Sequence, residues 1–285
     1  LNFNLFNLFC FDQVGGSVGK GTAIGDTDFD VVVFLNDHEP PFDQRVFNEM
    51  LAALGTVPGF YLGRQTRYSI SFQIRINRLT LDFDLLPATN MLDYDKHAED
   101  MAREQAIEVR RRMQDFANPS AFSSSLAEQT ILFMKNKPDD IVKVIKLARY
   151  WNQQIEIDEY VKGRSYMIEL VACWAQKGQP ACNLFTRFVR FLREMEDFSN
   201  LRIFFGHHYR RLSVPDEVWE QTPLVMDPCN LYNNLAEGIS QNVIGIFEYS
   251  AARSLGAIRD GLENVEDLFQ GSGMDYDESE YGDDD

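Results

Sequence analysis

One alternating stretch, Asp28 to Leu35, constrains this chain more than any other. It begins Asp28-Phe29-Asp30 and continues into the apolar run Val31-Val32-Val33-Phe34-Leu35. Side chains two residues apart on a β-strand point to the same face, so Asp28 and Asp30 project together while the residues after them enter a sheet. The sequence therefore predicts a pair of carboxylates at the mouth of a buried strand.

A second predicted strand, Leu81 to Leu86, supplies a third acidic side chain. If it pairs beside the first strand, Asp84 reaches the same place from far along the chain. Asp82 has the same strand parity as Asp84, so parity alone does not separate them. The apolar neighbours of Asp84 favour Asp84 as the third member.

Three converging carboxylates repel one another unless cations neutralise them. Mg²⁺ prefers oxygen ligands and commonly keeps water and substrate phosphates as further ligands. Two such ions, with Mn²⁺ as a substitute, can activate an attacking oxygen and stabilise a leaving one. Asp28, Asp30 and Asp84 are therefore predicted as both metal ligands and catalytic residues, which favours metal-dependent nucleotidyl transfer. For either segment alone, ordinary solvated acids near a strand end are an equally good interpretation.

The glycine-rich stretch from Gly15 to Thr22 does not fit a P-loop. That pattern needs glycine five residues before Gly19, where Val14 stands, and Ser or Thr after the lysine, where Gly21 stands. A dinucleotide-binding fingerprint fails as well, so a strand, a tight turn and a helix start remain.

At this turn, exposed N–H groups around Gly16 and the hydroxyl of Ser17 are predicted to hold triphosphate oxygens. Lys20 is predicted either to add a positive charge to the same site or to be a solvated loop lysine.

Composition limits the class of protein. With 285 residues, 45% of them hydrophobic, the chain can bury a sizeable core in one large domain or two lobes. No run of about 18 apolar residues suggests a membrane span, so no membrane partner is expected. The apolar opening, Leu1 to Phe11, lacks a basic flank and a cleavage site, which favours a buried strand over a signal peptide. Scattered cysteines without a CxxC motif argue against a zinc site or a disulfide scaffold and favour a reducing, cytoplasmic location.

The net charge of −17 is also informative. Seven acidic residues lie between Asp275 and Asp285, and this tail is predicted to be disordered. The rest of the chain is still acidic, which excludes a general polyanion binder because such binding draws on clustered Lys and Arg. A local basic patch remains open.

The hydrophobic pattern predicts an α+β protein. Strands are expected near 3–11, 28–35, 69–75 and 79–86, and helices over 41–54, 98–116, 121–135, 139–153 and 166–176. Lys146 and Arg149 lie three residues apart on the same helix edge, where a solvated stripe is the simplest interpretation. The change from strands to helices predicts a sheet lobe at 1–92, a helical lobe at 93–270 and the acidic tail at 271–285.

Taken in order, these segments resemble the 2'-5'-oligoadenylate synthetases, in a superfamily that includes cyclic GMP-AMP synthase and poly(A) polymerase. The similarity covers about residues 10–240. Its motifs are Gly15 to Thr22, Asp28 to Leu35, Phe83 to Ala88, Ala121 to Ser123, Ile145 to Trp151, Ser165 to Leu170 and Pro223 to Pro228.

The resemblance implies a two-lobed nucleotidyltransferase fold that binds donor and acceptor ATP. It implies two Mg²⁺ held by the three aspartates, and a donor triphosphate held by Ser17 together with Arg149, Ser165 and Tyr166 from the helical lobe. Lys146 is implied near the acceptor. The family chemistry is attack by an adenosine 2'-hydroxyl on the donor α-phosphorus, giving 2'-5'-linked oligoadenylate and pyrophosphate.

Family members activated by double-stranded RNA carry a basic face. Val14, Ile131 and Asp140 stand at three of its places here and Lys135 at a fourth, which argues against duplex RNA as an activator. Two alternatives stay open: a cyclic-dinucleotide synthase of the same superfamily, and a catalytically silent nucleic-acid-sensing protein.

Overall fold

The computed structural model describes residues 9–25, 28–36, 38–89, 111, 122–206, 210–261 and 268–269. Most of the predicted helix at 98–116, the acidic tail at 271–285 and the start of the predicted strand at 3–11 lie outside these residues. The chain divides into two compact units, which are treated separately below. The first is Leu1–Val142, Phe204–Gln221 and Met226–Asn234, and the second is Lys143–Ile203, Thr222–Val225 and Leu235–Asp285.

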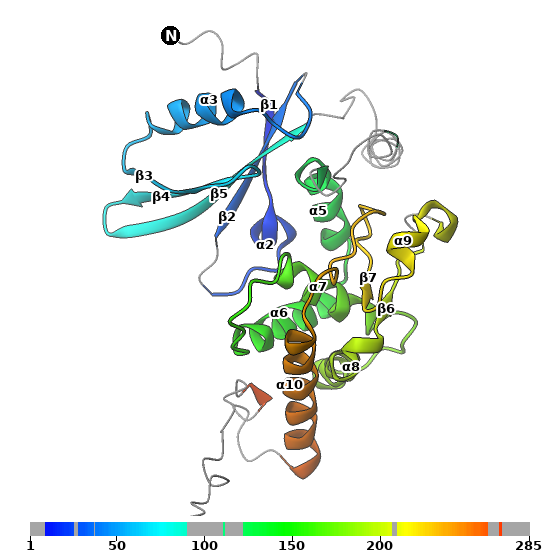
Figure 1. Ribbon diagram of the computed structural model, residues 1–285. Helices are drawn as coiled ribbons and strands as arrows, with labels where there is room; N and C mark the ends of the chain where they lie inside the picture. Colours follow the sequence, from blue (N-terminus) through cyan, green and yellow to red (C-terminus); the bar gives the residue numbers. More distant parts are fainter. Residues whose placement is uncertain are drawn as a thin grey trace, which may run out of the picture. The chain divides into compact units, whose positions relative to one another are not determined.

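The first unit is built on a mixed five-stranded sheet (Figure 1). Its strands are β1 (Phe9–Val14), β2 (Phe29–Leu35), β3 (Phe60–Gln65), β4 (Ile70–Ile76) and β5 (Leu79–Thr89), in the order β1-β2-β5-β4-β3. Strands β2 and β5 run parallel, and every other pair in the sheet is antiparallel. Two strands far apart in sequence are therefore direct neighbours.

One face of the sheet is covered by helix α3 (Gln44–Leu54), as Figure 1 shows. The side chain of Asp43 caps this helix by accepting a hydrogen bond of 3.0 Å from the Val46 N–H. Buried side chains of the helix pack on those of the strands, and this core consists of Val33, Leu35, Val46, Phe47, Met50, Ile70, Phe72 and Leu85. Burial of this apolar face positions the central strands.

Among the described residues, helix α5 (Ala127–Lys135) contributes to the cover of the opposite face. Val32, Phe34 and Ala88 form a buried cluster there, against which Ala127 of α5 packs. The turn before α5, a 3-10 helix at Ser124–Leu126, is fastened to β5 by a hydrogen bond of 2.9 Å from the Thr89 N–H to Ser125 Oγ. Asp30 lies on this same face, two residues before Val32.

The second unit is mainly helical. Its helices are α7 (Arg164–Trp174), α8 (Leu184–Glu196), α10 (Gln241–Asp260) and most of α6 (Asp139–Gln153), joined by the short parallel strands β6 (Arg202–Ile203) and β7 (Leu224–Val225). Buried aromatic side chains fill it, and the Trp151 indole donates a hydrogen bond of 3.1 Å to Ser254 of α10.

The remaining short elements of the described residues are α2 (Gly16–Lys20), α9 (Asp216–Trp219) and a 3-10 turn at Arg211–Ser213 in the first unit, and a 3-10 turn at Phe198–Asn200 in the second.

The predicted elements agree with the structure where the apolar residues of a segment repeat with one period, that of a strand or that of a helix. The expected strand at 28–35 and helix at 139–153 are confirmed. The expected end of the first strand at residue 11 is wrong, because β1 continues to Val14 and stops at the glycine turn. Strand β3 was not expected from the sequence; its mixture of aromatic, glycine and arginine residues has no clean alternation.

No helix among the described residues is long and apolar enough to cross a membrane. The predicted lobe boundary at residue 92 lies outside the described residues, and the two compact units have different limits. The α+β class itself is confirmed.

Candidate active site

The register of the two parallel strands brings the predicted acidic residues together. Asp30 of β2 stands directly opposite Asp84 of β5. Asp28 comes one residue before β2. Because it is two residues from Asp30, it adds a third carboxylate to the same face of the sheet. We call Asp28, Asp30 and Asp84 the acidic cluster, and the sheet face that carries it the carboxylate face.

Two phenylalanines explain why the acidic side chains all point one way. Phe29 and Phe83 are paired in register and stack with ring centroids 5.3 Å apart, and Phe72 of β4 stacks on Phe83 at 5.2 Å. This aromatic row lies on the α3 side, where Phe72 is part of the core. Because neighbouring residues on a strand alternate in direction, stacking of the phenylalanines turns the flanking aspartates to the opposite face.

The glycine turn, Gly15 and Gly16, lies against the acidic cluster. The Gly15 N–H donates a hydrogen bond of 2.8 Å to the Asp30 carbonyl. A Cβ added at Gly16 would collide with the carboxylate of Asp30, and Gly16 has a positive φ of 52°. Only glycine therefore fits this close approach without strain.

Helix α2 begins at the turn and lasts five residues. The Ser17 carbonyl accepts hydrogen bonds from the N–H groups of Thr22 (2.9 Å) and Ala23 (3.1 Å), which folds the following loop back onto the helix. Lys20 is only 7% exposed, so its interpretation as a solvated loop lysine is wrong. The turn is therefore folded back on itself, and the Lys20 side chain at its end is buried.

The electrostatics of the cluster are those of gathered like charges. Partial desolvation raises the pKa of the Asp28 carboxyl, and the negative charges of Asp84 and Asp82 raise it further. Asp82 is engaged with a neighbour, because it accepts a hydrogen bond of 2.7 Å from the Gln73 side chain on β4. Asp84, in contrast, occupies the register position opposite Asp30.

The donor set of the cluster fits a hard divalent cation, since it consists of carboxylate oxygens alone. Within the described ranges, however, no three His, Cys, Asp or Glu side chains converge closely enough to form a preformed metal cage. The geometry is that of an open pair on neighbouring strands with a third carboxylate beside it. An open site of this kind leaves room for water and phosphate oxygens as further ligands.

The residues predicted from the helical region lie in the second unit. Arg149 of α6 is 7% exposed and forms an ion pair of 3.3 Å with Glu169 of α7, which is fully buried. The predicted solvated stripe is therefore wrong for Arg149 but right for Lys146, which is exposed. Ser165 and Tyr166 occupy the first turn of α7, the serine exposed and the tyrosine half-buried.

Sequence reasoning missed two residues that contact the candidate residues, Glu169 beside Arg149 and Gln73 beside Asp82. Glu169 carried a signal, because an acidic residue inside the apolar run from Met167 to Val171 needs a partner when buried. Gln73 carried none. Ile131, expected on a surface face, is 4% exposed and belongs to the core, while Val14, Lys135 and Asp140 are exposed.

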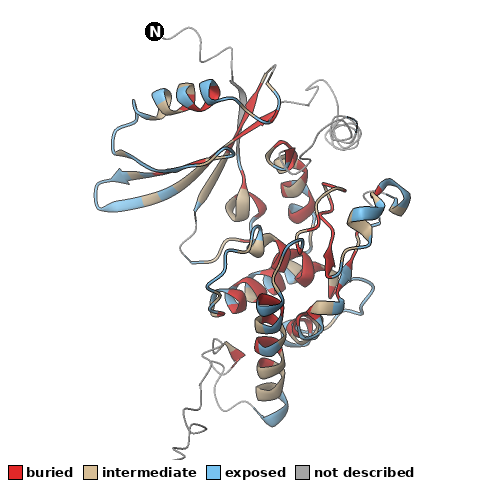
Figure 2. Ribbon diagram, viewed as in Figure 1, coloured by how far each residue is buried: buried red, intermediate tan, exposed pale blue. Residues whose placement is uncertain are grey.

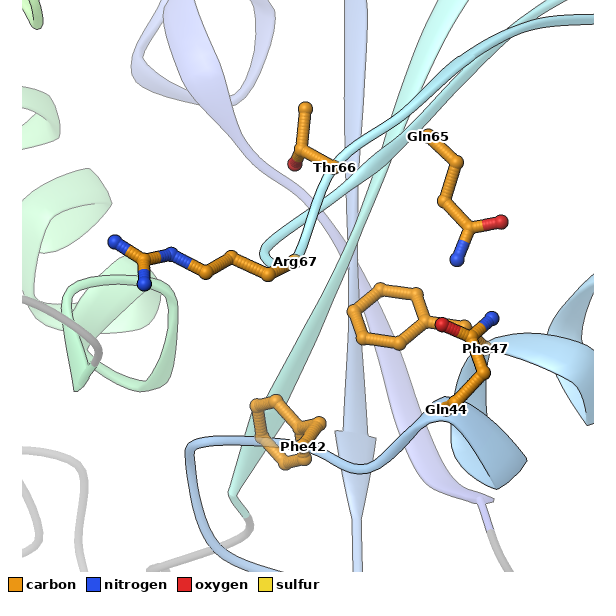
Figure 3. A pocket seen from close by; sticks show the side chains of 6 residues that line it. All are labelled: Phe42, Gln44, Phe47, Gln65, Thr66 and Arg67. Atoms are coloured by element: carbon orange, nitrogen blue, oxygen red, sulfur yellow. The ribbon is translucent and has the colours of Figure 1, made fainter.

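A shallow depression of about 440 Å³ lies apart from the acidic cluster. Figure 3 shows its lining side chains, which come from α3, the loop before it and the turn between β3 and β4: Phe42, Gln44, Phe47, Gln65, Thr66 and Arg67. Phe47 packs in the core on the α3 side, so the depression belongs to the sheet face opposite the carboxylates.

Similar solved structures show the fold. The Cid1 poly(U) polymerase with bound MgGTP superimposes with a TM-score of 0.59 at 12% identity, covering 92% of this chain and 86% of that one. The CdnC protein of E. coli MS115-1 with ATP gives a TM-score of 0.58 at 19% identity, covering 93% and 81%. The predicted nucleotidyltransferase fold is thereby confirmed.

Curated relatives point to one group of enzymes. The chain is 25% identical over 257 residues to 2'-5'-oligoadenylate synthase 3 of Rattus norvegicus, covering 78% of this chain but 22% of that protein. It is 24% identical over 259 residues to 2'-5'-oligoadenylate synthase 1A of Mus musculus, covering 79% and 69%. The chain thus spans about a fifth of the length of the first relative and about two thirds of the second.

A family model matches more than half of the chain. It is described as "2'-5'-oligoadenylate synthetase 1, domain 2, C-terminus" and aligns with residues 101–253. That range includes helices α6 and α7, which carry two of the motifs of the resemblance, Ile145 to Trp151 and Ser165 to Leu170. The chain therefore belongs to the 2'-5'-oligoadenylate synthetase family.

Proposed function

We propose that this protein is a template-independent adenylyltransferase that polymerises ATP into 2'-5'-linked oligoadenylates and releases pyrophosphate. The observation that carries the proposal is the register of Asp30 opposite Asp84 on parallel strands, directly beneath the glycine turn. Carboxylates that can hold metal ions and backbone N–H groups that can bind phosphate oxygens are components used in metal-dependent phosphoryl transfer.

The reaction forms one bond and breaks one bond at phosphorus. The 2'-oxygen of the acceptor adenosine bonds to the donor α-phosphorus, the bond from that phosphorus to the bridging oxygen breaks, and pyrophosphate leaves. The hydroxyl proton passes to the Asp84 carboxylate and then to solvent. Catalysis of this kind depends mainly on alignment and on neutralisation of charge.

Asp28, Asp30 and Asp84 are proposed to hold two Mg²⁺, for which Mn²⁺ can substitute. Bound metal would supply Lewis-acid polarisation of the phosphate oxygens and would offset the desolvation and the like charges that raise the pKa of Asp28. Without a cation, the same carboxylates would repel the triphosphate.

Binding of the donor triphosphate is assigned to the glycine turn. Gly16 and Ser17 present the backbone and hydroxyl at the start of α2, and Lys20 lies at its end. From the second unit, Lys146, Ser165 and Tyr166 are proposed as further nucleotide contacts, since they are exposed or half-buried on α6 and α7. Arg149 remains in this proposal, although its buried pair with Glu169 supports a structural role as well.

Incubation with ATP and Mg²⁺ tests the proposal. We expect pyrophosphate release and oligomers that resist a 3'-5'-specific nuclease, with both lost on addition of chelator. A cyclic product would identify a cyclic-dinucleotide synthase, and oligomers sensitive to the nuclease would overturn the 2'-5' linkage. The negative control is the Asp84→Asn variant under the same conditions.

The same incubation with duplex RNA tests the regulation. Two exposed positions of the expected basic face carry Val14 and Asp140 instead of a basic residue. A third position carries Ile131, which is buried in the core. We expect duplex RNA to change the initial rate less than twofold. A large increase would show that other residues bind duplex RNA.

A further inference from the structure

The carboxylate face continues beyond the acidic cluster to the edge of the sheet. In register order, Tyr61 of β3 stands opposite Gln73 of β4, and Gln73 stands opposite Asp82 of β5. The hydrogen bond from Gln73 to Asp82 shows that these side chains share one face. Tyr61 lies two strand spacings, about 10 Å, from Asp82, so one surface joins the edge strand to the cluster.

This outer part of the face is open to solvent. Tyr61 is 53% exposed, and Gln73 and Arg75 are also exposed. Figure 2 shows the hairpin of β3 and β4 largely in pale blue, in contrast to the buried central strands. These exposed side chains are accessible to a ligand.

Tyr61 and Arg75 are held as a pair. The Arg75 guanidinium lies over the Tyr61 ring, 5.2 Å from its centroid. The backbone is closely packed beside this pair, because the Arg75 N–H donates a hydrogen bond of 2.9 Å to the Gly59 carbonyl and a Cβ at Gly59 would collide with the Arg75 carbonyl. The pair presents an aromatic ring and a positive charge together on the exposed part of the face.

The charge of this region contrasts with that of the whole chain. Between Met50 and Leu81 there is no Asp or Glu, although the chain carries a net charge of −17. The same stretch contains four arginines, Arg64, Arg67, Arg75 and Arg78. Of these, Arg75 lies on the carboxylate face with Tyr61, whereas Arg67 lines the depression on the opposite face, so Arg75 is a positive charge that this surface offers to a polyanion.

Single-stranded nucleic acid is the polyanion that such a surface fits. Aromatic rings stack on successive bases and arginines contact the backbone phosphates, without dependence on base sequence. Protein partners of comparable affinity need a larger apolar core than Tyr61 and Gln73 provide. Continuity with the acidic cluster indicates that the bound strand leads to the reacting centre.

We propose that Tyr61, Gln73 and Arg75 form an oligoadenylate platform, which holds the 5' part of the growing acceptor strand while its terminal ribose lies at the acidic cluster. The Tyr61 ring stacks on a base, and Arg75 contacts a phosphate. This inference rests on the proposed function, because the strand that it binds is the product of that reaction.

Direct binding tests the platform without catalysis. The probe is fluorescein-labelled tetraadenylate, in 2'-5' and 3'-5' linked forms, measured by fluorescence anisotropy with chelator present. We expect Tyr61→Ala to weaken binding about tenfold and Tyr61→Phe to keep it, since stacking needs the ring and not the hydroxyl. Arg75→Gln should lower the slope of log affinity against log salt by about 0.7.

Two exposed residues elsewhere serve as matched controls. Tyr160 is 90% exposed and lies in the second unit, and Arg45 is exposed on α3, on the other side of the sheet. Tyr160→Ala and Arg45→Gln should leave the affinity within twofold of the parent. Absence of tetraadenylate binding by the parent, or parent-like binding by both Tyr61→Ala and Arg75→Gln, would overturn the platform.

Product length separates this inference from the proposed function. We expect Tyr61→Ala to form the dinucleotide from ATP at the parent rate but to make fewer products beyond the trimer, because only longer acceptors reach the platform. If the parent makes no oligomer yet binds tetraadenylate through Tyr61, the proposed function fails and the binding surface stands. If oligomers form and their length is unaffected by Tyr61→Ala, the platform fails and the function stands.

Discussion

The two charged centres of this protein are built in opposite ways. On the sheet of the first unit, the acidic cluster gathers like charges on one face, and partial desolvation together with the charges of Asp84 and Asp82 raises the pKa of Asp28. In the second unit, Arg149 and Glu169 place opposite charges 3.3 Å apart in a buried setting. Gathered like charges cost folding energy and point to a missing cation or substrate, whereas a buried opposite pair completes a core.

The largest effect is expected from Asp84→Asn. Loss of this carboxylate should lower ATP turnover by about a thousandfold or more, since each 1.36 kcal/mol of lost transition-state stabilisation costs about tenfold. Stability should not fall, because one repulsive charge is removed. Asp82→Asn on the same strand is the control and should cost less than about tenfold, since Asp82 is bonded to Gln73. Near-normal pyrophosphate release by Asp84→Asn would defeat the site assignment.

Disruption of the buried ion pair between Arg149 and Glu169 should lower the stability of the protein. Glu169→Gln leaves the Arg149 guanidinium without its carboxylate in the core, and we expect a loss of about 3 kcal/mol in the free energy of unfolding, measured with urea. The exposed pair of Arg211 and Asp216 is the matched control. Asp216→Asn should cost less than about 1 kcal/mol. Equal losses in the two variants would remove the distinction between the two kinds of charged centre.

The glycine turn gives a third test. Gly16→Ala places a methyl group against the Asp30 carboxylate in a backbone conformation with positive φ, so we expect turnover to fall about a hundredfold. Gly21→Ala is the control, because Gly21 also has a positive φ of 75° but nothing lies within 4 Å of the added atom. It should cost about 1 kcal/mol of stability and leave turnover nearly unchanged. A similar drop in both would show that backbone strain alone matters.

The smallest effect is a pH dependence from Asp28. Its pKa is raised in the folded state, so its stabilising contribution is complete below the unfolded pKa of about 3.9 and is lost as the pH rises through the folded pKa. We therefore expect Asp28→Asn to gain stability relative to the parent as the pH rises through that window, measured by urea unfolding with chelator present. A relative gain that shrinks with rising pH would contradict the shift.

Strong periodicity allowed much of the fold to be predicted from sequence. Strand β2 and helix α6 are single-period segments, and both were expected within one residue of their observed limits. Strand β3 was missed because Gly63 and Arg64 interrupt its alternation, and pairing with β4 rather than local preference makes it a strand. Helix α8 was also missed, although its apolar residues recur with the spacing of a helix and its charged residues lie between them.

The candidate site was predictable in its residue types but not in its surroundings. Asp28 and Asp30 could be named from parity, the apolar neighbours of Asp84 favoured it over Asp82, and the position of Gly16 followed from the turn. The buried state of Lys20 and of Arg149 could not, since long cationic side chains are usually exposed and only the packed structure shows otherwise.

By itself, the sequence determined the alternation that places two aspartates on one side of a strand and the glycine turn, because these depend on local spacing, and its motifs carried the resemblance to the family. Only the tertiary structure decided that β2 and β5 lie in register, that Asp82 binds Gln73, and that Tyr61 and Arg75 share the carboxylate face. The reason is physical: strand pairing joins residues far apart in the chain, and no local pattern encodes which strands become neighbours.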